Sequence, residues 1–179
     1  MIAILLADGF EEIEALTPLD ILRRAGLDVK TCAIGSKIAV GAHKIPVICD
    51  VFASEINPNE VSLLILPGGM PGTLNLDASH FTDDLISAVT KNGGRIAAIC
   101  AAPLILGKRG LLDGRSATCY PGFEGELKGA EISSLPVVTD GNITTAKGMG
   151  VALEFSLELV RLILGEDKAN EISKSVMKV

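Results

Sequence analysis

Short, continuously apolar stretches alternate with longer amphipathic stretches along this chain, and this alternation restricts the fold more than any other feature. Residues 2–7 and 61–66 are apolar runs typical of strands that are covered on both faces of a parallel sheet. Between the first run and a second strand at 28–34, residues 10–25 have the spacing of an amphipathic helix that stops at Gly26. This order predicts a three-layer α/β fold, in which helices cover both faces of a mostly parallel sheet.

The rest of the chain continues the alternation. We expect a short strand or edge hairpin within 36–50, a helix at 79–91, strands at 95–99 and 116–119 with a short helix between them, a hairpin at 137–146, and helices at 150–165 and 166–177. The hairpin prediction rests on an Asp-Gly turn flanked by β-branched residues. At 179 residues the chain can form one well-buried core but not two ordinary domains, so residues 1–179 are predicted to be a single domain.

Composition excludes several classes of partner. Apolar residues make up 48% of the chain and charged residues 21%, and the formal net charge is −6. A protein that binds a phosphate backbone needs a basic face, so nucleic acid is not an expected partner. The longest nearly uncharged run is too short to cross a bilayer, and apolar strand residues begin at Ile2 without a charged segment before them. We therefore expect no membrane association, no signal peptide and a cytoplasmic location.

The cysteines do not suggest a metal site. They stand at 32, 49, 100 and 119 without a C-x-x-C pair, and His43 and His80 are the only histidines. A zinc site is improbable with this ligand set, so no metal or other cofactor is predicted. In a reducing compartment the four cysteines are free thiols, and three of them need no role beyond packing.

Cys100 is the exception because of where it lies. The stretch 95–103 reads R-I-A-A-I-C-A-A-P, which indicates a buried strand that turns sharply into a helix with Cys100 on the turn. Backbone N–H groups at the start of that helix would face the sulfur, and the helix dipole favours the reactive thiolate. The alternative is simple packing, since free cysteine is among the most buried residue types.

Three loops follow apolar strands and are candidates for one common site. They comprise residues 8–14, the glycine-rich stretch 67–72 and the turn at 100–103. If the three strands are neighbours, a carboxyl group, a set of backbone donors and a thiol meet at one edge of the sheet. A carboxylate beside a thiolate is repulsive, so the pair requires that burial keep the glutamate protonated. A plain turn is the competing interpretation of the glycines.

Four stretches resemble a known family. D-G-F-E-E-I-E at 8–14, L-P-G-G at 66–69, A-A-I-C-A-A-P at 97–103 and A-K-G-M-G-V-A-L-E-F at 146–155 occur in the order found in the ThiJ/PfpI superfamily. The likeness extends over essentially the whole chain and is strongest to the branch of the parkinsonism-associated protein deglycase and its bacterial relatives. The resemblance implies a flavodoxin-like core with the cysteine on a nucleophile elbow, and a homodimer.

The resemblance also implies roles for individual residues. Cys100 would be the nucleophile and Glu14 its protonated partner, while the N–H groups of Gly69 and Ala101 would form an oxyanion site. Glu11 and Glu12 would be solvated charges in the first turn of the helix, as is also expected without the family.

Two departures from the family pattern bear on mechanism. Protease-like relatives have a histidine where this chain has Ala101, and many members of the deglycase branch have a histidine where it has Tyr120. A Cys-His proteolytic mechanism needs a base beside the nucleophile, so it is poorly supported. Tyr120 could instead supply a hydroxyl group or pack against the pocket, to which Gly68 also contributes. His43 and His80 are expected at the surface.

The leading hypothesis is an enzyme that acts on reactive α-oxoaldehydes, of the glutathione-independent glyoxalase or protein deglycase type, that is, a hydro-lyase or hydrolase. A Cys100 thiolate would add to the aldehyde or glycated adduct, and protonated Glu14 would shuttle a proton. The alternative is a sensor of oxidative stress or a protective binding protein that acts through a Cys100 sulfinic acid. An intracellular cysteine protease is the third hypothesis. The sequence leaves the physiological substrate open.

Overall fold

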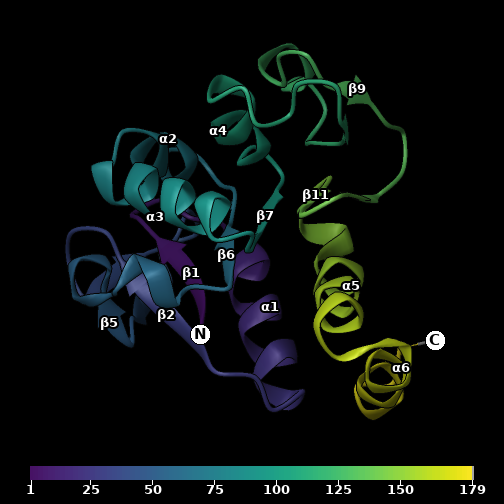
Figure 1. Ribbon diagram of the computed structural model, residues 1–179. Helices are drawn as coiled ribbons and strands as arrows, with labels where there is room; N and C mark the ends of the chain where they lie inside the picture. The colour runs from purple at the N-terminus through teal and green to yellow at the C-terminus, as the bar shows by residue number, and fades with distance from the viewer. Residues whose placement is uncertain (179) are drawn as a thin grey trace.

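The computed structural model describes residues 1–178 and has a central sheet of seven strands (Figure 1). The strand order is β10-β11-β7-β6-β1-β2-β5, and every neighbouring pair is parallel except β10 with β11. The strands comprise β1 (Ile2–Leu6), β2 (Val29–Ala33), β5 (Val51–Phe52), β6 (Leu63–Leu66), β7 (Arg95–Ile99), β10 (Val137–Asp140) and β11 (Ile143–Ala146). This is the mostly parallel α/β fold that the sequence predicts.

Helices lie on both faces of the sheet. They are α1 (Glu12–Arg24), α2 (Gly72–Asp77), α3 (His80–Lys91), α4 (Pro103–Lys108), α5 (Ala152–Leu164) and α6 (Glu166–Ser175). Helix α1 packs beside α5, and α5 packs beside α6, while α3 contacts β6 and β7. Figure 1 shows α2 and α3 across the sheet from α1 and α5. Right-handed crossovers place α1 and α3 on opposite faces, because the chain leaves β1 toward one edge of the sheet and leaves β6 toward the other.

Two small sheets lie outside the central one. β3 (Ile38–Val40) and β4 (Pro46–Ile48) form an antiparallel hairpin, which confirms the expected edge hairpin. The strand expected at 116–119 is only β8 (Ser116–Ala117), and it pairs with β9 (Glu131–Ile132) rather than joining the central sheet. The sequence does not predict the short helix α2 and strand β5, because six helical residues or a two-residue strand carry too little periodicity to detect.

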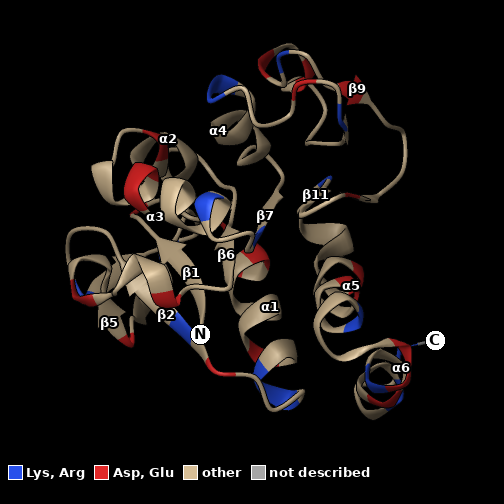
Figure 2. Ribbon diagram, in the orientation of Figure 1, with Lys and Arg blue, Asp and Glu red and all other residues tan. Residues whose placement is uncertain are grey.

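The core is aliphatic and surrounds the three middle strands. Every residue of β1 and β6 is buried, and so are four of the five residues of β7. Figure 2 shows Lys and Arg interspersed with Asp and Glu over the ribbon. No helix among the residues that the structure describes is long and apolar enough to cross a membrane.

Candidate active site at the carboxyl ends of the central strands

Cys100 lies on the turn between β7 and α4, in a backbone conformation that non-glycine residues rarely adopt. Its φ is +65°, in the left-handed region that is costly for residues with a Cβ. Two backbone hydrogen bonds hold the turn: Cys100 N–H donates to the Ala146 carbonyl oxygen at 2.9 Å, and Tyr120 N–H donates to the Cys100 carbonyl oxygen at 2.8 Å. The residue is 8% exposed. The structure therefore has the strand-to-helix elbow that the sequence indicates.

Glu14 lies in the first turn of α1 and is completely buried. Its Oε2 accepts a hydrogen bond from Gly68 N–H at 3.0 Å, and its own N–H donates to Oε2 of Glu11 at 2.8 Å. Within residues 1–178, Oε1 of Glu14 has no hydrogen-bond partner. A buried carboxyl oxygen in this state costs free energy, so it marks a place where a donor can be accommodated.

Gly68 stands between the carboxyl group and the thiol. A Cβ on Gly68 would lie 2.6 Å from both Cys100 Cβ and Glu14 Oε2, so the absence of a side chain is what allows the two groups to face each other. Gly69 has a φ of +90°, and a Cβ there would collide with the Glu11 backbone nitrogen. Glu11 N–H also donates to the Gly68 carbonyl oxygen at 2.9 Å. The three loops after β1, β6 and β7 therefore meet, because these strands are neighbours in the sheet.

Burial and mutual proximity raise the pKa values of both Glu14 and Cys100. Burial raises the pKa of Glu14 to about 7, with a further upward contribution from the charge of Glu11, while its contacts with Cys100, Gly68 and Met149 lower the pKa. Burial and then the charge of Glu14 raise the pKa of the Cys100 thiol to about 12, and the N–H groups of Gly69 and Ala101 lower it. The pair therefore carries at most one negative charge near neutral pH.

The helix dipole alone would lower the pKa of Cys100, whereas in the structure this pKa is raised. The thiol is desolvated and faces a carboxyl group, and these two effects raise its pKa more than nearby N–H groups lower it. The increase in the Cys100 pKa that comes from the charge of Glu14 is absent when Glu14 is protonated. A proton shared between the two groups is thus more consistent with the site than a permanently exposed thiolate.

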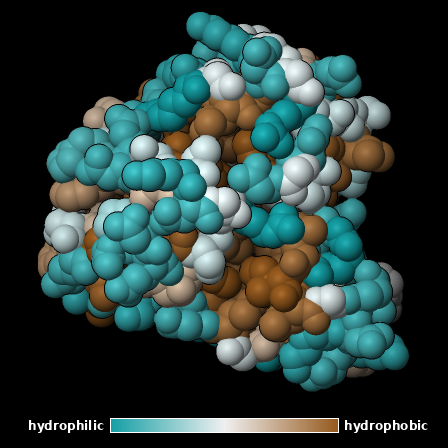
Figure 3. Space-filling model, in the orientation of Figure 1, coloured by the Kyte–Doolittle hydropathy of each residue, from teal (hydrophilic) through white to brown (hydrophobic). Residues whose placement is uncertain are grey.

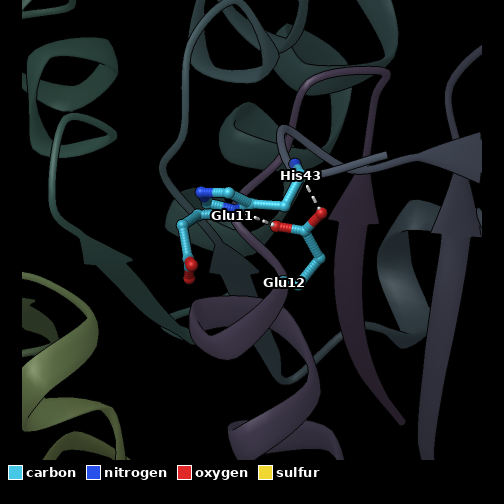
Figure 4. Close-up of side chains that lie close together, drawn as sticks. All are labelled: Glu11, Glu12 and His43. Atoms are coloured by element: carbon cyan, nitrogen blue, oxygen red, sulfur yellow. Dashed lines mark hydrogen bonds and ion pairs between the residues drawn. The ribbon is translucent and has the colours of Figure 1, made fainter. Parts of the chain in front are cut away.

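A second cluster of ionisable groups lies beside the site (Figure 4). Glu12 accepts from His43 N–H at 2.7 Å and pairs with His43 Nδ1 at 2.8 Å, which raises the pKa of His43. Glu11 and Glu12 are each only 5% exposed, so their expected solvation is wrong. Residues 40–43 cover the start of α1, a tertiary contact that the helix sequence does not reveal. The His43 side chain is exposed as expected, and His80 begins α3.

Glu11, Glu12 and His43 have side chains that could in principle bind a metal ion. One ligand atom from each of Glu11, Glu12 and His43 lies within 4.8 Å of the others. However, both oxygens of Glu12 are engaged by His43, and Oε2 of Glu11 accepts from Glu14 N–H. The cluster also lies at the N-terminus of α1, where the helix dipole disfavours a cation. Its geometry fits an ion pair that closes the loop better than a metal centre.

A fourth loop reaches the site, and sequence reasoning missed it. β11 is parallel to β7, so the loop after Ala146 lies at the same edge of the sheet. A Cβ on Gly148 would lie 3.2 Å from the Tyr120 ring and 3.7 Å from Glu14 Oε1. The sequence predicts a hairpin that ends at 146 and a helix that begins at 150, but it does not place the loop between them at the site. The pairing of β11 with β7 is the signal that would have assigned it to the site.

Comparisons with known proteins agree with this fold. The DJ-1/PfpI family pattern matches residues 1–162. Protein dj-1beta of Drosophila melanogaster is 33% identical over 177 residues, covering 97% of this chain and 95% of its own length. A protein named deglycase from Pyrococcus abyssi is 31% identical over 165 residues, covering 90% and 98%. The structure of oxidised DJ-1 from Toxoplasma gondii superposes with a TM-score of 0.94 at 30% identity, covering 98% and 97%. This chain therefore belongs to the DJ-1/PfpI family.

Proposed function

We propose that this chain is a cysteine-dependent enzyme that converts reactive α-oxoaldehydes to 2-hydroxy acids through Cys100 and Glu14. The observation that carries the proposal is the pairing of a thiol on an elbow with a completely buried carboxyl group across Gly68. A pKa of about 7 suits a group that must both accept and donate a proton at neutral pH. The family includes a protein named deglycase, and early glycation adducts of the same aldehydes are the second substrate class.

The reaction begins with addition of sulfur to the aldehyde carbon. As the S–C bond forms, the thiol proton passes to the Glu14 carboxylate, which leaves Glu14 protonated beside a hemithioacetal. The N–H groups of Gly69 and Ala101, which act on the sulfur in the resting site, are available to stabilise the oxyanion that forms.

Proton transfer between the two carbons completes the chemistry. Glu14 donates its proton to the oxyanion, takes the proton from the carbon bound to sulfur, and returns it to the neighbouring carbon. The hydroxyl proton of the first carbon passes to the oxygen of the second. The first carbon becomes a thioester carbonyl and the second an alcohol, so one carbon is oxidised and the other reduced without an external oxidant. Water then cleaves the thioester, which releases the 2-hydroxy acid and restores the thiol.

Consumption of methylglyoxal by the purified protein tests the proposal. Cys100→Ser removes the nucleophile and Glu14→Gln removes the proton carrier, so each should lower kcat/KM at least about 100-fold. Cys119→Ser and Glu126→Gln are matched controls elsewhere in the chain and should retain activity. If both Cys100→Ser and Glu14→Gln consume methylglyoxal at the wild-type rate, the proposal is wrong.

A redox function is the second candidate, and the same pair of residues favours it. A protonated Glu14 could donate a hydrogen bond to an oxidised Cys100 sulfur and hold it at the sulfinic acid. A relative in this family has been solved in an oxidised form. Mild hydrogen peroxide followed by peptide mapping should place the added oxygens on Cys100, and Glu14→Gln should reduce that preference. Oxidation spread evenly over Cys32, Cys49 and Cys119 as well would argue against a tuned site.

A protease function has less support. In the residues that the structure describes, His43 pairs with Glu12 rather than with the thiol, and Ala101 follows the nucleophile. A purified preparation that keeps peptidase activity in wild type and loses it in Cys100→Ser would reverse this ranking.

A further inference from the structure

A shallow cleft of about 180 Å³ adjoins the candidate active site. Its walls come from the segment after Cys119 and from the loop between β11 and α5. They comprise Tyr120, Pro121, Lys147, Gly148, Met149, Gly150 and Val151. The proton chemistry proposed above uses none of these side chains.

The walls of the cleft are almost wholly apolar. The Tyr120 ring and the Met149 side chain are both substantially exposed, although side chains of this kind are normally buried in a protein core. Lys147 contributes mainly its aliphatic stem, because its ammonium group donates to the Ser134 carbonyl oxygen at 2.7 Å. The cleft therefore offers apolar contact and few groups that could hydrogen-bond a polar ligand.

One wall residue of the cleft, Gly148, lies close to Glu14. Gly148 separates the cleft from Oε1 of Glu14, the buried oxygen without a partner, and that oxygen would be 3.7 Å from a Gly148 Cβ. On the opposite wall, Tyr120 contacts the turn that carries the nucleophile, because its N–H donates to the Cys100 carbonyl oxygen. Oε1 of Glu14 and the sulfur-bearing turn thus border the same apolar surface.

We propose that this cleft binds the side group of the α-oxoaldehyde, so that the preferred substrates carry a bulky apolar group rather than the methyl group of methylglyoxal. This inference rests on the proposed function. Sulfur binds the aldehyde carbon, and Glu14 must reach both that carbon and the next. The side group on the second carbon is therefore next to Glu14 and extends past Gly148 into the cleft.

The size of the cleft fits one ring. An apolar cavity of about 150 Å³ holds a benzene molecule, so 180 Å³ accommodates a six-membered ring. Placing one extra methylene group in an apolar pocket typically changes kcat/KM by about 10- to 200-fold. Because this cleft is shallow and open to solvent, we expect an effect near the lower end of that range.

Cyclohexylglyoxal and methylglyoxal form a matched pair of alkyl substrates with the same reacting carbons. We expect kcat/KM for cyclohexylglyoxal to be about tenfold higher in the wild-type protein. Met149→Gln and Val151→Thr keep the side-chain size but make the wall polar, so each should lower the ratio of the two kcat/KM values several-fold. Met177→Gln makes the same change at a residue that is 82% exposed near the C-terminus and should leave the ratio unchanged.

The outcomes separate this inference from the proposed function. A wild-type ratio of one or less, with methylglyoxal turnover that still requires Cys100, overturns the cleft proposal and leaves the function standing. A ratio of about ten that neither Met149→Gln nor Val151→Thr lowers would show that another surface holds the side group. If neither aldehyde is consumed faster than by Cys100→Ser, both proposals fail.

Discussion

A carboxyl group that is removed from water titrates differently from one at the surface, and Glu14 is the clearest case in this protein. It is the third residue of α1, where a negative charge ordinarily faces solvent and benefits from the helix dipole. Here the side chain points under the loop that contains Gly68, and desolvation dominates its titration. Glu14 therefore holds a proton near neutral pH and can pass it to Cys100 or accept one from it.

The raised pKa of Glu14 predicts a pH dependence of stability. Because the folded-state pKa of about 7 exceeds the ordinary glutamate value of 4.5, the folded protein binds the proton more tightly than the unfolded chain. The contribution to stability is complete below about pH 4.5 and is lost as the pH rises through 7. The shift corresponds to roughly 3 kcal/mol, at 1.36 kcal/mol per pKa unit.

Urea unfolding of the wild type and Glu14→Gln at pH 5 and pH 8 measures this effect. The variant cannot titrate at this position, so the free energy of unfolding should fall more for the wild type than for the variant over this range. An equal change in the two proteins would mean that Glu14 keeps an ordinary pKa in the fold.

At the scale of elements, the arrangement of the site depends on strand order. β7, β6 and β1 are adjacent and parallel, so their following loops meet at one edge. β11 adds a fourth loop on the other side of β7. Close approach of these loops leaves no space for side chains at Gly68, where the thiol and carboxyl group meet.

Gly68→Ala should disrupt the site without removing either reacting group. The new methyl group would overlap Cys100 Cβ and Glu14 Oε2, and overpacking of this kind typically costs about 1–3 kcal/mol. We expect a loss of stability in that range in chemical denaturation and at least a tenfold change in the rate at which iodoacetamide alkylates Cys100. Gly125→Ala is the control, because nothing lies within 4 Å of its Cβ position. Wild-type stability and alkylation in Gly68→Ala would contradict the packing described here.

At the scale of the whole molecule, one apolar surface is not covered by the chain itself. Figure 3 shows an apolar patch in the region where α1 and α5 lie side by side in Figure 1. Along α1, Ile13 is exposed and Leu16 and Leu19 are only partly buried. Patches of this kind commonly mark interaction surfaces, and we propose that a second copy of the chain covers this one to form a homodimer.

Sedimentation velocity tests the homodimer. The wild type should sediment as a dimer, and Leu16→Glu should shift it toward monomer because a charge would be buried in the interface. Ile132→Glu places the same charge on the exposed strand β9 and should leave the dimer intact. A monomeric wild type at micromolar concentration would rule out the proposal.

Agreement between sequence and structure is best where the signal is local. β1 and β7 follow from short apolar runs, and α1 ends beside Gly26, whose φ of +85° needs glycine. The Asp140-Gly141 turn likewise produces the predicted hairpin of β10 and β11. The prediction for 116–119 is wrong in length and in pairing, because β8 has only two residues and pairs with β9 outside the central sheet. Which sheet such a short strand joins depends on a partner strand that is distant in sequence.

For the site, the sequence by itself determined that Cys100 stands on a sharp turn after a buried strand and that glycines follow a neighbouring strand. The side-by-side order of β7, β6 and β1 was an assumption there, and the tertiary structure decided it. The structure also decided that Glu11 and Glu12 are buried, that Glu14 rather than solvent faces the thiol, and that the loop after β11 borders the site. The physical reason is that turns and apolar runs act over a few residues, whereas desolvation depends on which distant loops cover a group.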